Sequence, residues 1–160
     1  MKPPITVSDI TPHTDNPFPE PFRTTLGSAE WRPLGDAFAL SQFGVNHETL
    51  LPNAQSALRH WHSKSDELVY VLQGKLWLIT DEGEQELSAG MCAGFKAGEP
   101  NGHHLHNRSA ETAQFLVVGS RIEGDKVVYP DDDIQWLEDK TTGHCVAARK
   151  DGSAYSDDMD

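Results

Sequence analysis

Apolar residues recur with a period of two along short stretches of the middle of the chain. In DELVYVLQG, from Asp66 to Gly74, they fall on both alternating faces, and KLWLIT, from Lys75 to Thr80, repeats the pattern. This period is typical of β-strands, and a strand that is apolar on both sides is covered on both sides. We therefore predict a hairpin with Gly74 at its turn. Its outer face needs a second sheet, the N-terminal arm or another subunit, and we expect a homodimer.

Later stretches are also short and bounded by turn residues, among them QELSAGMCAGF, HHLHNRS, AQFLVVGSR and KVVYP. Regularly spaced short strands predict an all-β sandwich or barrel, and no helical pattern exceeds two turns. Six of the ten prolines lie in the first 24 residues, so residues 1–36 are expected to form an extended arm. Residues 37–130 are expected to form the barrel. Residues 131–160 form an extension that packs on it through Trp136, Leu137 and Val146.

Composition excludes several classes of function. The net charge of −12 disfavours a nucleic-acid partner, because a polyanion would be repelled. The apolar runs are far too short for a membrane span, and the first residues show no secretory signal, so we expect a cytoplasmic protein. Cys92 and Cys145 match no metal or redox spacing and are expected to be small buried residues.

The stretch HWHSKSDE carries the candidate chemistry. His60 and His62 share one face of a strand, and Glu67 joins them if the intervening turn preserves the phase. Polar groups that face a core each cost roughly 1–3 kcal/mol when unpaired. A divalent metal satisfies imidazole nitrogens and a carboxylate together. Taken alone, a pair of histidines two residues apart is more often a surface feature, so the rest of the spacing matters.

That spacing resembles the cupin superfamily. His60, His62, Glu67 and Gly74 follow its first motif, H-x-H-x4-E-x6-G. The second motif is similar to GMCAGFKAGEPNGHHLHN, in which the matching positions are Gly90, Gly98, His103 and Asn107.

The match to both motifs has departures. Ala54 stands where the first motif has a glycine, and Lys96 stands where the second has a proline. The loop before the last histidine is two residues longer, which leaves His103 and His104 as alternatives. Strand phase favours His103, because it shares a face with Leu105 and Asn107.

The resemblance implies a double-stranded β-helix, the cupin jelly-roll barrel. It implies one divalent transition metal (Zn, Fe, Mn, Ni or Cu) held by His60, His62, Glu67 and His103. The sequence is also similar to stand-alone bacterial cupins described as sugar-phosphate isomerases. We therefore expect a metal-dependent enzyme on a small polar metabolite, either an isomerase or epimerase or a dioxygenase. The alternative is a non-catalytic cupin that binds a metal or small ligand.

Some nearby residues receive separate expectations. Glu67 is expected to be a ligand that can also act as a catalytic base when it leaves the metal. Strand phase turns Trp61 away from the metal. The same phase predicts that Arg59, Lys96 and Arg108 are solvated surface charges. A regulatory sensor is disfavoured, because no residues remain for a DNA-binding domain.

Overall fold

The computed structural model describes residues 2–138 and 144–155. Its helical segments are short: Val7–Asp9 (η1), Phe22–Leu26 (α1) and Leu34–Ala37 (α2). The strands are Ala29–Pro33 (β1), Phe43–Leu50 (β2), Trp61–His62 (β3), Glu67–Gln73 (β4), Lys75–Thr80 (β5), Gly83–Ser88 (β6), Cys92–Phe95 (β7), His104–His106 (β8), Ala113–Ser120 (β9), Val127–Val128 (β10), Gln135–Glu138 (β11) and Cys145–Ala148 (β12). The predicted all-β class is confirmed. Within the described ranges, no helix has the length and hydropathy needed to cross a bilayer.

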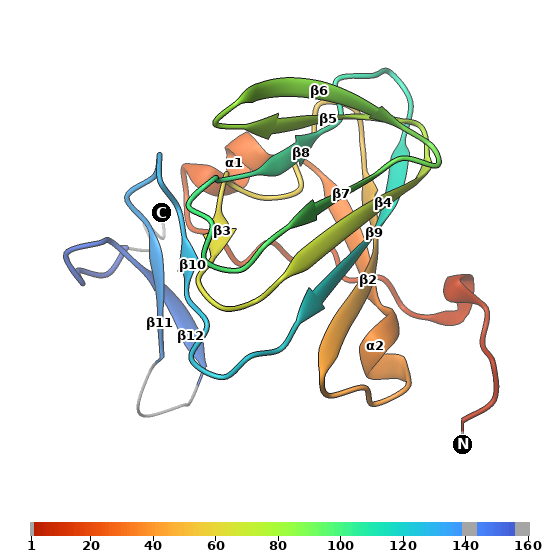
Figure 1. The fold of residues 1–160 in the computed structure, drawn as a ribbon, viewed down its shortest axis with the longest axis horizontal. Helices are drawn as coiled ribbons and strands as arrows, with labels where there is room; N and C mark the ends of the chain where they lie inside the picture. The colour runs from red at the N-terminus through yellow and green to blue at the C-terminus, as the bar shows by residue number, and fades with distance from the viewer. Residues whose placement is uncertain (1, 139–143, 156–160) are drawn as a thin grey trace, which may run out of the picture.

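Two antiparallel sheets build the body of the fold (Figure 1). The larger sheet has the strand order β1-β2-β9-β4-β7, and the smaller one has the order β6-β5-β8. Two short pairs, β3 with β10 and β11 with β12, lie beside them. Some neighbouring strands, such as β2 and β9 or β5 and β8, come from distant parts of the chain, so the sheets bring together residues that the sequence separates.

The main core lies between the two sheets. Leu50, Val71 and Phe115 of the larger sheet and Leu76 of the smaller sheet are completely buried and belong to one cluster. Burial of an aliphatic or aromatic side chain of this size stabilises a fold by about 1.5–3 kcal/mol. One face of each of these strands is therefore covered by the opposite sheet.

The predicted hairpin between β4 and β5 is wrong. β4 pairs with β7 and β9, whereas β5 pairs with β6 and β8, so the chain changes sheets at Gly74. Gly74 has a φ of +77°, and a Cβ there would lie 3.0 Å from the carbonyl oxygen of Thr112. Consecutive apolar strands can pack across a core as well as beside each other, and here both strands bury one face against the opposite sheet.

The N-terminal segment contributes more than an extended arm. β1 pairs with β2 along its whole length, from Ala29 opposite Leu50 to Pro33 opposite Asn46. The larger sheet thus begins before the boundary predicted at residue 37. Helix α2 ends at Ala37, where the barrel was predicted to begin, and β2 starts at Phe43.

A second apolar cluster joins the two ends of the chain. Leu26 from the N-terminal segment packs with Leu58, Tyr129 and Ile134, and Trp136 joins them as predicted. Leu137 and Val146 do not, because they are 38% and 45% exposed on the two-stranded pair β11 and β12. The remainder of the predicted extension, residues 139–143 and 156–160, lies outside the described residues.

The outer face of β4 is apolar and uncovered in the single chain. Leu68, Tyr70 and Leu72 are each about 40% exposed, although the pattern predicts that something covers them. Cys92 lies opposite Tyr70 and is exposed, as is Cys145, so the expectation that both cysteines are buried is wrong. Both thiols sit on strands whose outer faces meet solvent.

Candidate metal centre

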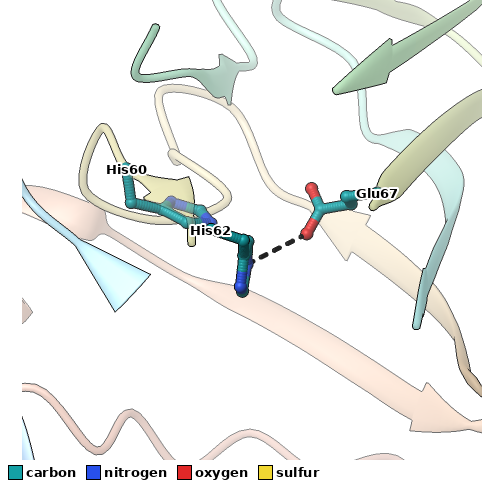
Figure 2. A group of neighbouring side chains, drawn as sticks. All are labelled: His60, His62 and Glu67. Atoms are coloured by element: carbon teal, nitrogen blue, oxygen red, sulfur yellow. Dashed lines mark ion pairs between the residues drawn. The ribbon is translucent and has the colours of Figure 1, made fainter. Parts of the chain in front are cut away.

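Three separate segments bring the candidate ligands together. His60 and His103 form an isolated antiparallel bridge, with backbone N···O distances of 3.1 and 2.9 Å. His62 lies in β3, and Glu67 is the first residue of β4. In Figure 2 the two histidines approach from one side and Glu67 from the other. The ligands converge because strand pairing brings distant segments together: Glu67 and His103 are 36 positions apart in the sequence, yet their side chains are in contact.

The donor atoms are close enough to share one ion. His60, His62 and Glu67 each offer a ligand atom within 4.8 Å of the others, and His62 Nε2 lies 3.6 Å from Glu67 Oε2. His103 joins them through its Nε2, which lies 3.1 Å from Glu67 Oε1, and its ring centroid is 5.0 Å from that of His60. The structure thus brings together all four residues predicted as ligands.

His103, rather than His104, faces Glu67. His103 is only 4% exposed, and Leu105 and Asn107 on the same face are also buried. Its ring stacks on Phe95 at a centroid distance of 3.4 Å. His103 Nδ1 is a buried nitrogen without a hydrogen-bond partner among the described residues. The strand-phase argument therefore chose the side chain that points inward.

The hydrogen bonds of two histidines determine which nitrogen is available to a metal. His60 Nδ1 lies 2.8 Å from the carbonyl oxygen of Leu58, which can only accept, so Nδ1 carries the proton. Burial lowers the pKa of His60 to about 4, which keeps the ring neutral. His62 Nδ1 likewise donates to Asp125 at 2.7 Å. In the neutral form of either ring, Nε2 then has a free lone pair, which is the form that binds metal.

Asp125 is a supporting residue that sequence reasoning missed. Besides His62, its carboxylate accepts hydrogen bonds from Ser63 Oγ at 3.1 Å and from the Lys64 backbone N–H at 2.7 Å. Burial would raise the pKa of Asp125, but these bonds outweigh it and hold the pKa well below its usual range. No motif marks this residue, because 63 positions separate it from His62.

A cation between these groups fits their charges. The neutral His62 Nε2 and the Glu67 carboxylate are both acceptors, so they face each other favourably only when a proton or a metal ion lies between them. Contact with Glu67 and the bond to Asp125 raise the pKa of His62. Burial would raise the pKa of Glu67, but His103 and His62 outweigh it and hold the pKa well below its usual range. Imidazole nitrogens with free lone pairs and one carboxylate are ligands that transition metals bind.

A cavity of about 200 Å³ adjoins the cluster. It is lined by His62, Glu67 and His103 together with Trp61 and Lys96, although strand phase predicts that the last two point away. A small molecule in this cavity would therefore lie beside the candidate ligands.

Arg59 is not the solvated charge that we expected. Its side chain is 17% exposed, and Nε and Nη2 bind the two carboxylate oxygens of Asp131 at 2.6 and 2.8 Å. It also forms an ion pair with Asp81 and donates to the carbonyl oxygen of Gly102 at 3.3 Å. Because Arg59 precedes His60 and Gly102 precedes His103, this side chain connects the two strands of the site. Arg108, by contrast, forms a surface pair with Glu84.

Comparison with known proteins agrees with this geometry. The model of the cupin domain family matches residues 46–119. A crystal structure from Silicibacter pomeroyi, described as a sugar phosphate isomerase from the cupin superfamily, is 39% identical; the match covers 96% of this chain and 97% of that one, with a TM-score of 0.87. This chain belongs to the cupin superfamily. The predicted jelly-roll barrel is thus confirmed. Cupins typically bind a metal, and the cluster of His60, His62 and Glu67 could hold one.

Two further solved structures are similar to this one. A putative sugar phosphate isomerase from Acidithiobacillus ferrooxidans is 28% identical, with 76% of each chain covered and a TM-score of 0.67. A polyketide cyclase from Streptomyces resistomycificus is 23% identical, with 83% of this cupin and 89% of the cyclase covered and a TM-score of 0.65, which shows a shared fold alone. No protein with a curated description matches this chain.

Proposed function

We propose that this cupin binds one divalent transition metal (Zn, Fe, Mn, Ni or Cu) through Nε2 of His60, His62 and His103 and a carboxylate oxygen of Glu67. The observation that carries this proposal is the pair of hydrogen bonds in which Nδ1–H of His60 donates to the Leu58 carbonyl and Nδ1–H of His62 donates to Asp125. Those bonds direct two nitrogen lone pairs toward one buried carboxylate, and such a group is satisfied by a cation.

We further propose that the protein is an isomerase or epimerase of a small polar metabolite, such as a sugar phosphate. A bound divalent metal supplies Lewis-acid chemistry that polarises a carbonyl group. The isomerase descriptions of two similar structures support this choice, above all the one that is 39% identical over nearly the whole chain. The cavity beside His62 and Glu67 supports it too, because it offers space for a small substrate.

Glu67 fits the role of ligand better than that of base. A general base works best when its pKa lies near the working pH. Two histidines hold the pKa of Glu67 well below its usual range, so its carboxylate accepts a proton only weakly. We therefore assign Glu67 to the metal, and proton transfer in the proposed reaction needs another group or a water molecule.

Metal analysis by mass spectrometry and a proton-exchange assay test the proposal together. We expect about one metal per chain, its loss in His62→Ala, and its retention in His13→Ala, whose histidine is exposed and stacks on Trp31 instead of a candidate ligand. Incubation with aldose and ketose phosphates in D₂O, followed by NMR, is expected to show metal-dependent exchange. Stoichiometric metal in His62→Ala would mean that the ligands are misassigned. Metal without turnover would favour a non-catalytic cupin, and oxygen consumption would favour a dioxygenase.

A further inference from the structure

A second, larger cavity lies between the N-terminal segment and the larger sheet. Its volume is about 740 Å³, within the range of roughly 300–1,000 Å³ that small-molecule sites occupy. Its walls come from residues 14–18, from Leu26 to Trp31, and from the inner face of β2. None of the four candidate metal ligands lines it. It is therefore a space distinct from the metal centre.

Glu48 is the unusual group in this cavity. It lies opposite Trp31 on β1 and opposite the fully buried Phe115 on β9, so its side chain is on the inner face of the sheet. Protein surrounds the carboxyl, yet part of the residue remains accessible from the cavity. Among the described residues, no side chain or backbone group donates a hydrogen bond to it. Burial, reinforced by the charge of Glu67, raises the pKa of Glu48 to about 8.

The other groups around Glu48 are uncharged. Asn46 is the next inward residue on β2, and Gln55 and Ser56 line the adjoining wall. Trp31 adds an aromatic wall, and its ring stacks on His13 at a centroid distance of 4.4 Å. The charges that line the rest of the cavity are of both signs, among them Arg23 and Asp15. Close to Glu48, however, the other polar partners on the wall are the amides of Asn46 and Gln55 and the hydroxyl of Ser56, and amides and a neutral acid can bind hydroxyl groups.

We infer that this cavity binds a neutral, hydroxyl-rich small molecule of monosaccharide size, with Glu48 as its central hydrogen-bond partner. The inference goes beyond the proposed metal chemistry and does not depend on it. A protonated carboxyl both donates and accepts a hydrogen bond, and a hydroxyl group does the same. A ligand hydroxyl therefore supplies the partner that the protein does not provide.

The test measures binding to the full-length protein in EDTA at pH 6.5, by saturation-transfer NMR and calorimetry. D-ribose, D-glucose and D-mannose are the neutral probes, and D-gluconate and D-glucosamine are charged probes of similar size. We expect at least one neutral probe to bind at least about tenfold more tightly than the charged ones. Glu48→Ala should weaken that binding about tenfold or more, while Glu48→Gln, which keeps a neutral donor and acceptor, should retain most of it.

Matched controls separate the cavity from the metal centre. Glu86→Gln makes the same change on the exposed strand β6, and it should bind like the unmodified protein. His62→Ala should also bind normally, because the cavity does not include it. If Glu48→Ala does not fold, Asn46→Ala is expected to weaken binding in its place. Absence of binding by every neutral probe, or unchanged binding in the folded Glu48→Ala or Asn46→Ala variant, would overturn the inference.

Discussion

The buried carboxyl of Glu48 should make the stability of this cupin fall as the pH rises. Its pKa is raised from 4.5 to about 8 in the folded chain, chiefly by burial and further by the charge of Glu67. Between these two pH values the folded chain holds a proton that the unfolded chain has released. Unfolding therefore releases a proton in this window, and the free energy of unfolding decreases as the pH increases.

The size of the effect follows from the two pKa values. Each tenfold change in an acid constant corresponds to about 1.4 kcal/mol. A carboxyl that titrates near pH 8 instead of 4.5 is thus expected to cost about 3–5 kcal/mol of stability once it is ionised. This is a large part of the 5–15 kcal/mol that stabilises a typical domain. Glu48→Gln removes the ionisation with little change of shape, so this variant should escape the loss.

Urea unfolding followed by tryptophan fluorescence, at pH 5 and pH 9 in EDTA, measures the effect. We expect the two proteins to be about equally stable at pH 5 and Glu48→Gln to be more stable by several kcal/mol at pH 9. Comparison at the same pH cancels the contributions of titrating groups that do not interact with Glu48, and Glu86→Gln controls for the loss of a surface carboxylate. A stability difference that changes by less than about 0.5 kcal/mol between the two pH values would refute the reasoning.

Three further outcomes are expected. Metal should dissociate below about pH 5–6, because protons then compete for the histidine ligands, beginning with His62, whose pKa is raised; full occupancy after dialysis at pH 4 would contradict this. Arg59→Ala should lose about 1–3 kcal/mol in thermal or urea unfolding, and Arg59→Lys should not restore it, because lysine lacks the two-pronged geometry. Arg108→Ala is the matched surface control and should change stability by less than about 1 kcal/mol. If the homodimer prediction is right, the unmodified protein should sediment as a dimer in analytical ultracentrifugation, and Leu68→Glu should sediment as a folded monomer. A monomeric unmodified protein would show that the outer face of β4 meets solvent.

The parts of the centre that were predictable are those governed by local spacing. Alternation along a strand places His60 and His62 on one face, and the same rule puts His103 rather than His104 toward the interior. These arguments need no knowledge of which strands are neighbours, because they depend only on positions within one strand.

The parts that were not predictable depend on pairing between distant segments. β4 and β5 read as a hairpin because they are adjacent and apolar, but their partners lie elsewhere in the chain. Asp125 reaches His62 only through the pairing of β10 with β3. Arg59 reads as a solvated charge and nothing singles out Glu48, since no local pattern shows that Asp131 or the enclosing N-terminal segment will surround them.

The change of sheet at Gly74 has a consequence for anyone who wishes to label or permute this protein. The chain there is enclosed, with Ala113 only 3.1 Å from the place of an added Cβ, so a peptide inserted after Gly74 would push the layers apart. The turn at Gly90 has no neighbouring atom within 4 Å of the same place, and its surroundings are open. New termini or a fluorescent tag belong at Gly90, where added residues extend into solvent.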